Sequence, residues 1–385
     1  MKKNVLIITG TRADYGLLKP VIEAMQKSKK LIPKLLVTGM HTLKKYGLTV
    51  NDIKKDKMPI SCIVKISEND DMLTSLSKEI IGIKKFCEKN KPDLILVLGD
   101  RDEMLAGAIT GVHLGIPVAH LHGGDISGSC NVDELNRHAI TKLSHLHFPA
   151  TQKSYQRVIR LGEERWRVFN VGAPGLDSLS KMKFLNKKEI ARKFRLDTNK
   201  KWFIVVQHPV PLEKISTKQQ IRPTLLAVSK FDSEKIILYP NSDTGSNFII
   251  NEISKYKNKK HYHVFKNLDR IVYLSLLKHS NVIIGNSSSG IIESSYFKLP
   301  AVNIGTRQKG RECSQNVIHA DYNEKKIKKA IESALSKRFK NICRKIKSPY
   351  GNGAASKKIV KIIEKHINNK QLFFKTLQKI DTTDL

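Results

Sequence analysis

The sequence predicts an α/β protein made of two Rossmann-like domains that face a cleft. Short apolar runs alternate with amphipathic stretches from the first residues, which is typical of a parallel sheet covered by helices. The same alternation of apolar runs and amphipathic stretches begins again after a segment rich in glycine and proline, Gly172–Gly175. Several apolar runs also end in polar loops, which is where open α/β sheets bind their ligands.

The expected strands are short apolar runs in both halves of the chain. In the first half they are Val5–Thr9, Leu35–Thr38, Ile60–Val64, Leu94–Leu98, Val118–Leu121 and Leu146–Pro149; in the second they are Phe203–Val206, Ile236–Tyr239, His263–Phe265, Val282–Ile284 and Ala301–Asn303. Helical periodicity is expected from about Leu17 to Lys27 and from about Ser356 to Asn368. We therefore expect a first domain over 1–175, a second over 176–370 and a polar tail over 371–385.

The composition is that of a globular protein without a membrane span. Of the 385 residues, 40% are hydrophobic and 27% are charged. No apolar run approaches the roughly 20 residues that a membrane-spanning helix needs. The five cysteines are scattered and form no CxxC pair, which argues against a disulfide framework and a zinc site. A cytoplasmic location with no membrane partner is expected.

The formal net charge of +34 raises the alternative of a nucleic-acid-binding protein. The lysines are spread along the chain, however, and no zinc-finger or RNP pattern accompanies them. We therefore expect no nucleic-acid partner. Salt-sensitive binding of DNA or RNA would support the alternative.

The stretch Asn281–Glu293 carries the strongest local signal. An apolar run is followed by Gly-Asn-Ser-Ser-Ser-Gly, which indicates a strand, a polar loop and the start of a helix. Free backbone N–H groups at a helix start attract phosphate, although a serine-rich N-cap is an equally simple interpretation. The predicted phosphate-binding residues are Ser287, Ser288, Ser289 and Gly290, with Glu293 placed for the hydroxyls of a ribose.

Three other loops of the second half carry polar or basic side chains. His208 ends one expected strand and can donate to a phosphate or a leaving-group oxygen. Asn241 follows the next strand and offers a small amide. Arg307 and Arg311 come one loop after the serines, and arginine suits bidentate binding of phosphate.

Charged residues also follow strands of the first half. Arg12 follows the first strand and could meet an anion, whereas Asp100 directly follows Leu94–Leu98 and could instead cap the next helix. The run His-Leu-His122-Gly-Gly-Asp125 offers imidazoles and a carboxylate for acid/base work. Because its spacing fits no familiar ligand motif, we expect no metal.

A helix is expected to open at Val132, with Leu135, Ala139 and Leu143 as its apolar stripe. Asp133 either caps this helix or faces the same cleft as Asp100 and Asp125. Like charges in a partly dry pocket raise one another's pKa values, which would give proton donors near neutral pH.

Taken together and in order, these motifs resemble the hydrolysing UDP-N-acetylglucosamine 2-epimerases, in the branch that supplies sialic and legionaminic acid synthesis. The matching motifs span roughly residues 4 to 320 and are GTRADYG, GDR, HGGD, DELNRHAITKLSHLH, QHP, GNSSSGIIE and GTRQKGR. The resemblance implies a glycosyltransferase-B type fold, no metal or other cofactor, and often a homodimer.

The resemblance also implies roles for individual residues. Nucleotide-diphosphate contacts are implied for Arg12, His208, Ser287, Ser288, Glu293 and Arg311. Acid/base roles are implied for Asp100, His122, Asp125 and Asp133, with the division of labour among them open. His208 would also assist departure of the diphosphate.

The reaction that the resemblance implies converts UDP-N-acetylglucosamine to N-acetylmannosamine and UDP. A base removes the proton at C2 while UDP leaves C1, and water and a proton then add to the resulting 2-acetamidoglucal. The same reaction on UDP- or GDP-linked N,N'-diacetylbacillosamine stays open, because sugar specificity depends on the shape of the pocket. A glycosyltransferase of the same fold is a further alternative, which would need an acceptor subsite.

Overall fold

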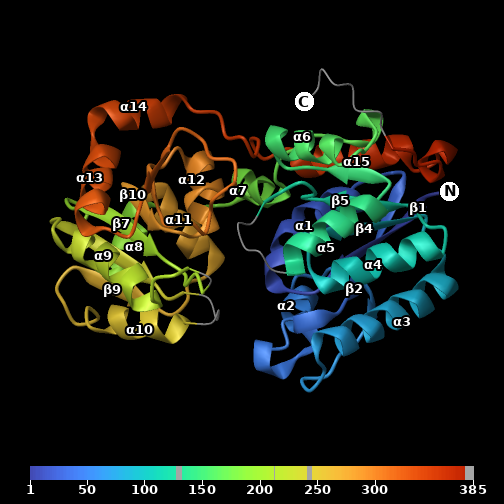
Figure 1. Ribbon diagram of the computed structural model, residues 1–385, viewed down its shortest axis with the longest axis horizontal. Helices are drawn as coiled ribbons and strands as arrows, with labels where there is room; N and C mark the ends of the chain where they lie inside the picture. The colour runs from blue at the N-terminus through green and yellow to red at the C-terminus, as the bar shows by residue number, and fades with distance from the viewer. Residues whose placement is uncertain (127–131, 212, 241–244, 378–385) are drawn as a thin grey trace. The chain divides into compact units, whose positions relative to one another are not determined.

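The structure, a computed structural model, describes residues 1–126, 132–211, 213–240 and 245–377. The chain forms two compact units, each an α/β assembly (Figure 1). The first unit comprises Met1–Ser180 and the chain from Tyr350 onward, and the second comprises Lys181–Pro349. Asn241, expected in the nucleotide site, lies outside the described residues.

The first unit is built on a parallel six-stranded sheet in the order β3-β2-β1-β4-β5-β6. Its strands are β1 (Lys3–Thr9), β2 (Leu31–Val37), β3 (Ile60–Ile63), β4 (Leu94–Leu98), β5 (Val118–Leu121) and β6 (Leu146–Phe148). Val5 and Ile7 of β1 belong to one buried cluster, whereas Leu6 and Ile8 belong to another. Because successive side chains of a strand point to opposite faces, both faces of this sheet are covered.

Helices of the first unit begin close to the ends of the strands. They are α1 (Arg12–Gln26), α2 (Val50–Lys55), α3 (Met72–Asn90), α4 (Asp102–His113), α5 (Val132–Leu143), α6 (Gln152–Arg160), α7 (Asp177–Lys181) and α15 (Ala355–His366). The expected loop before Leu17 is wrong, because α1 starts at Arg12. Thr11 and Asp14 form a capping box there: each side chain accepts a hydrogen bond from the backbone N–H of the other residue.

The second unit repeats the connectivity of the first, in the order β12-β11-β10-β7-β8-β9. Its strands are β7 (Lys201–Val206), β8 (Ser233–Leu238), β9 (Tyr262–Phe265), β10 (Val282–Gly285), β11 (Ala301–Ile304) and β12 (Val317–Ala320). The sequence analysis missed β12. This edge strand is only half buried and therefore lacks a continuous apolar run.

The helices of the second unit include one that is much shorter than expected. They are α8 (Lys187–Phe194), α9 (Thr217–Ser229), α10 (Ser246–Ser254), α11 (Arg270–His279), α12 (Ile292–Phe297), α13 (Glu324–Leu335) and α14 (Lys337–Lys345). The serine motif leads into a 3₁₀ turn, Ser288–Gly290, and then into α12, which has six residues. The dipole that so short a helix presents to an anion is correspondingly small.

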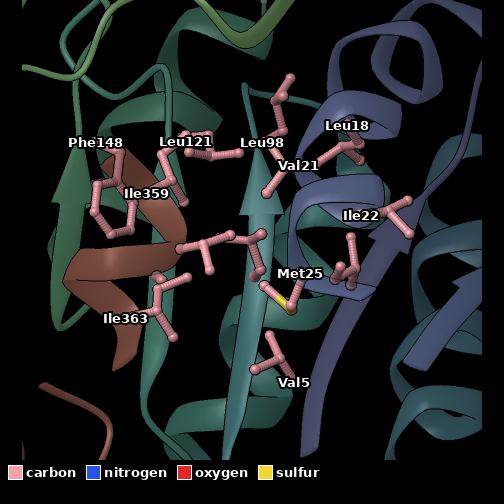
Figure 2. Close-up of a cluster of buried hydrophobic side chains, with 14 of the residues drawn as sticks. Val5, Leu18, Val21, Ile22, Met25, Leu98, Leu121, Phe148, Ile359 and Ile363 are labelled. Carbon is pink, nitrogen blue, oxygen red and sulfur yellow. The ribbon is translucent and has the colours of Figure 1, made fainter. Parts of the chain in front are cut away.

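Helix α15 belongs to the first unit, so the expected assignment of residues up to 370 to the second domain is wrong. Ile359 and Ile363 of α15 lie in the same buried cluster as Met25 and Phe148 (Figure 2). The carboxylate of Asp177 accepts hydrogen bonds from the backbone N–H groups of Ala355 (3.0 Å) and Ser356 (2.5 Å), the first residues of α15. A cap from a distant residue thus joins the returning chain to the first unit.

Replacing Asp177 by alanine should lower the free energy of unfolding by about 1 to 3 kcal/mol, because two buried N–H groups lose their acceptor. Urea denaturation of the wild type and the variant measures this change. Asn186→Ala, which removes the exposed N-cap of α8, is the control and should cost at most about 1 kcal/mol. An unchanged free energy of unfolding for Asp177→Ala would show that this cap does not hold α15.

Candidate active site

The residues expected to carry chemistry lie at the carboxyl ends of strands, close to the point where each sheet changes its direction of winding. That point is the junction of β1 with β4 in the first unit and of β7 with β10 in the second. Ligands of doubly wound sheets bind there. Asp100 follows β4, His208 follows β7 and Ser287 follows β10.

A buried guanidinium organises the carboxylates of the first unit. Arg137 of α5 is 4% exposed, and its Nη2 donates to Oδ2 of Asp100. Its Nη1 donates to Oε2 of Glu134 at 2.7 Å and to the backbone carbonyl of Asp125 at 2.8 Å. The sequence analysis, which considered only like charges here, did not expect a cation beside Asp100.

The sequence analysis named Arg137 only as part of a motif and assigned it no role. The reason lies in α5, whose expected apolar stripe is wrong: Leu135 is 70% exposed and Ala139 is also exposed. The helix instead buries Asn136, Arg137, Ile140 and Thr141. The pairing of Arg137 with partners across the fold overrides the local hydrophobic pattern.

His122 adopts a strained backbone conformation and has one unused ring nitrogen. Its φ of 64° lies in the left-handed region, which residues with a side chain rarely adopt. Nδ1 of His122 lies 3.0 Å from Oδ2 of Asp125, whose Oδ1 accepts a hydrogen bond from Ser154. Because an ionised carboxylate only accepts, Nδ1 carries the proton, and in the neutral ring Nε2 then carries the lone pair. Nε2 is buried and has no hydrogen-bond partner within the described ranges.

A buried histidine supports the loop that carries Asp100. Nε2 of His120 lies 2.7 Å from the carbonyl oxygen of Gly99, and Nδ1 lies 3.2 Å from Oγ1 of Thr141 in α5. Burial lowers the pKa of His120 to about 3, so the imidazole is neutral. It therefore donates from Nε2 to the carbonyl of Gly99, while its Nδ1 contacts the hydroxyl of Thr141, which itself donates to the carbonyl of Arg137 at 2.9 Å. The ring thus ties the β4 loop to α5.

Asp133 lies in the first turn of α5. Burial alone would lower the pKa of Arg101, but the carboxylates of Glu103, Asp14 and Asp133 raise it. Arg101 also donates from Nε to Oε2 of Glu103 at 3.1 Å. The charge of Asp133 thus raises the pKa of Arg101, which lies on the loop after β4 beside Asp100.

In the second unit, Asn286 joins the ends of β7 and β10. Its Oδ1 accepts from the backbone N–H of His208 at 2.7 Å, and its Nδ2 donates to the carbonyl of His208 at 2.8 Å. A Cβ on Gly285 would lie 2.0 Å from the carbonyl oxygen of Val206, so only glycine allows this approach of the two strands. His208 and Ser287 therefore emerge side by side from neighbouring strands.

The serine motif is in part an N-cap, which was the alternative interpretation of its sequence. Ser287 caps the 3₁₀ turn, with its hydroxyl accepting from the N–H of Ser289 at 3.4 Å and lying 3.0 Å from Oγ of Ser289. The hydroxyl of Ser289 also bonds that of Tyr273. Gly290, by contrast, has space beside it, because a Cβ there would meet only Cδ1 of Ile283, at 4.0 Å.

Two cations, Arg270 and Arg311, act on the carboxylate of Glu293, and the sequence analysis did not name the first of them. Burial raises the pKa of Glu293, while the charges of Arg270 and Arg311 oppose this effect. Arg270 is the first residue of α11, and no motif in the sequence pointed to it. Arg307 donates from Nη1 to the carbonyl of Asn286 at 3.2 Å, which places it beside the serine turn.

Arg12 is bound to a partner within its own unit. It lies in the first turn of α1 and is exposed, and its Nε and Nη2 donate to Oδ2 of Asp52 at 3.0 and 2.7 Å. An anion would have to share or displace this ion pair. Among the residues that the structure describes, no group of three or more His, Cys, Asp and Glu side chains is placed to hold a metal ion.

Glu79 and Glu103 form a buried acidic pair near the loops after β2 and β4. Glu79 of α3 is 1% exposed; its Oε1 accepts from the hydroxyl of Thr38 at 3.0 Å, and its Oε2 has no hydrogen-bond partner in the described chain. Burial raises the pKa of Glu79 to about 8, the nearby Glu103 carboxylate adds to this rise, and the Thr38 hydroxyl opposes it. Glu79 is therefore protonated at neutral pH.

Comparisons with known proteins identify the relatives of this chain. Residues 23–364 match the family described as UDP-N-acetylglucosamine 2-epimerase. The chain is 40% identical to the hydrolysing UDP-N,N'-diacetylbacillosamine 2-epimerase of Legionella pneumophila, over 94% of this chain and 96% of the relative. It is 34% identical to a UDP-N-acetylglucosamine 2-epimerase of Neisseria meningitidis serogroup B, over 87% of this chain and 88% of the relative.

A solved structure shares the fold. The crystal structure of a UDP-N-acetylglucosamine 2-epimerase from Neisseria meningitidis bound to UDP-N-acetylglucosamine matches with a TM-score of 0.81 at 21% identity, over 94% of this chain and 100% of that chain. The predicted fold, two Rossmann-like units of the glycosyltransferase-B type, is confirmed. None of the helices in the described part of the chain has both the length and the apolar character needed to cross a bilayer.

The raised pKa of Glu79 predicts a pH-dependent stability. Between its ordinary value of 4.5 and about 8, the folded state holds a proton that the unfolded state has released, so stability falls as the pH rises through this window. Glu79→Gln should remove that part of the decline, a difference of more than about 1 kcal/mol between pH 5 and pH 8.5. Urea denaturation at both pH values measures it.

The exposed Glu88 lies on the same helix, and Glu88→Gln should keep the pH dependence of the wild type. If Glu79→Gln also kept the pH dependence of the wild type, Glu79 would be ionised in the folded state.

Proposed function

The chain belongs to the UDP-N-acetylglucosamine 2-epimerase family, and we propose that it is a hydrolysing member, which eliminates UDP from a UDP-linked 2-acetamido sugar and adds water to the product. One observation carries this proposal: Nε2 of His122, which is buried and has no partner among the described residues, lies in a constellation with Asp125, Arg137 and Asp100. Such a group of proton-transfer side chains suits chemistry at a carbon–hydrogen bond.

We assign the binding of the nucleotide to the second unit. Ser287, Ser288, Ser289 and Gly290 line the turn that follows β10, and the space beside Gly290 leaves room for a phosphate oxygen. His208, Arg307 and Arg311 supply charge or hydrogen-bond donors for the leaving diphosphate, and Glu293 accepts ribose hydroxyls. We assign Arg12 of the first unit a role in binding an anion, which requires that Asp52 release it.

We assign removal of the C2 proton to His122. With its proton on Nδ1 and held by Asp125, the ring accepts a proton at Nε2 and becomes an imidazolium that the Asp125 carboxylate stabilises. The electrons of the C2–H bond form the C1–C2 double bond as the C1–O bond breaks and UDP leaves. The donors of the second unit stabilise the negative charge that develops on the diphosphate.

We assign the return of a proton to Asp100, with Asp133 beside the same loop. Water adds to C1 and gives one proton to a carboxylate, and a carboxylic acid delivers one proton to C2. Asp100 takes up the proton that the water loses and gives one proton to C2, so its net protonation is unchanged over the cycle. His122 then releases its proton to solvent, which restores the free enzyme.

Two sugar nucleotides are candidates for the substrate. UDP-N-acetylglucosamine is the substrate expected from the sequence, and the relative from Neisseria meningitidis carries that substrate in its name. UDP-N,N'-diacetylbacillosamine is the second candidate, because the higher identity of 40% is to an enzyme named for it. The homodimer that the resemblance implies stays a prediction.

The elimination predicts where isotopes from the solvent appear. The protein should release UDP from at least one of the two sugar nucleotides without an acceptor. Product formed in D2O should carry deuterium at C2, because the returning proton comes from a group that exchanges with water. With ¹⁸O-labelled water, the label should appear at C1, because the C1–O bond breaks.

Mass spectrometry and proton NMR of the product measure both labels. Ordinary hydrolysis would put ¹⁸O at C1 and leave protium at C2, without change of configuration. A product epimerised at C2 with full protium there would rule out the elimination. Little turnover without an acceptor sugar, followed by rapid turnover with one, would favour the glycosyltransferase.

Asp100→Asn should lower the turnover number at least about a hundredfold, because an amide cannot carry the proton. The amide oxygen can still accept from Arg137, so the fold and the affinity for UDP should change little. Asp102→Asn is the matched control. Asp102, the first residue of α4, accepts a hydrogen bond from Nδ2 of Asn136 at 2.8 Å, and this variant should keep the wild-type turnover number within a few-fold. An active Asp100→Asn protein would assign the proton return to another group.

A further inference from the structure

The C-terminal segment is docked on the first unit, although its polar sequence predicted a free tail. A 3₁₀ turn, Lys370–Phe373, follows α15, and Leu372 is fully buried in the same core as α1 and α15. The segment from this turn to Leu377, the last residue described before the chain's end, is called the C-terminal strap below. It contributes both backbone and side-chain groups to polar contacts.

A buried arginine holds the backbone of the C-terminal strap. Arg167 has no exposed surface, and it donates to the carbonyl oxygens of Gln371 (3.1 Å), Leu372 (2.9 Å) and Phe374 (2.5 Å). Its Nε also donates to Oε2 of Glu164 at 2.6 Å. A buried guanidinium needs these acceptors, because leaving it unpaired is costly. The docking is therefore a specific contact and not a chance packing of a chain end.

The side chain of Lys375 reaches the end of α5. Its Nζ donates to the carbonyl oxygen of Lys142, in the last turn of that helix, at 2.5 Å and to that of Ser144, just after the helix, at 2.7 Å. It also lies 2.8 Å from Oε2 of Glu163. A cation at this place satisfies carbonyl groups that have no helical partner and interacts favourably with the helix dipole.

Glu163 connects Lys375 to the neighbouring strand. It is fully buried, and its oxygens also meet Nζ of Lys142 at 2.7 Å and Nε2 of His147 in β6 at 3.0 Å. Burial alone would raise the pKa of Glu163, but His147, Lys375 and Lys142 lower it to about 2. The carboxylate is therefore charged, and the ammonium of Lys375 offsets part of the cost of burying it.

The helix end that Lys375 holds leads directly to the proton-transfer groups. Thr141, in the last turn of α5, meets His120, which in turn holds the carbonyl of Gly99 next to Asp100. Arg137, one turn earlier, binds Asp100 itself. Displacement of the last turn of α5 would therefore act on Asp100 by two routes.

We propose that Lys375 is a positioning residue for the acid/base site, and that docking of the C-terminal strap sets the position of α5 on which proton transfer depends. This inference rests on the proposed function. It predicts that loss of Lys375 impairs the chemical step while UDP binding, assigned to the second unit, stays intact. A strap that only stabilised the fold would affect both properties together or neither.

The test compares Lys375→Met with the wild type. The turnover number for the better of the two sugar nucleotides should fall about ten- to a hundredfold, since small displacements of catalytic groups have effects of this size. The affinity for UDP by calorimetry should stay within twofold. Lys361→Met is the matched control, because it removes the same charge from an exposed position on α15 and should leave both quantities unchanged.

Lys375→Arg, which keeps a cation with several donors, should recover most of the turnover. Hydrogen exchange gives a readout that does not require activity: in Lys375→Met, the backbone amides of residues 137–144 should exchange faster, and those of α9 in the second unit should not. Truncation after Asn369 should have the same effects as Lys375→Met. If the truncated chain fails to fold, the result for Lys375→Met alone decides the question.

Two results would overturn the proposal. One is wild-type turnover together with unchanged exchange in α5 for Lys375→Met. The other is a parallel loss of turnover, UDP affinity and thermal stability, which would make the strap a general anchor. A wild-type protein that is inactive on both sugar nucleotides would contradict the proposed function instead, and the exchange experiment would still show whether Lys375 holds α5.

Discussion

The buried guanidinium of Arg137 makes the interactions on which the chemistry proposed for the first unit depends. Its charge has to be paired, and its partners come from three places: Asp100 after β4, the carbonyl of Asp125 after β5, and Glu134 within α5. Pairing of buried charges seldom adds net stability, but removing one partner is costly. The arrangement therefore fixes where these groups lie, and α5 has to turn a polar face inward to permit it.

The two units share one sheet connectivity, and the proposed function assigns them different tasks. In each, polar residues follow the strands at the change of winding. In the second unit, the neutral side chain of Asn286 joins the strand ends and leaves serines, His208 and arginines for an anion. In the first, the joining group is charged, and carboxylates and imidazoles surround it. A diphosphate site and a proton-transfer site can thus arise from one architecture through the side chains at its strand ends.

The sequence allowed prediction of every described strand except β12 and of residues that directly follow strands, such as Asp100 and Ser287, because both depend on local patterns. Features that depend on distant partners could not be predicted. Burial of Arg137 contradicts the apolar stripe of its own helix, and the cap that Asp177 gives α15 joins residues far apart in the chain. The role of Lys375 depends on the end of α5, and nothing near it in the sequence indicates this contact.

The most direct test of the central role of Arg137 is the turnover number of Arg137→Lys, measured together with the affinity for UDP. Lysine keeps the positive charge, but its ammonium cannot reach Asp100, Glu134 and the carbonyl of Asp125 in the geometry of a guanidinium. The account predicts that turnover falls at least about a hundredfold while UDP affinity is unchanged. Turnover within about threefold of the wild type would contradict it, because charge alone would then suffice to organise the site.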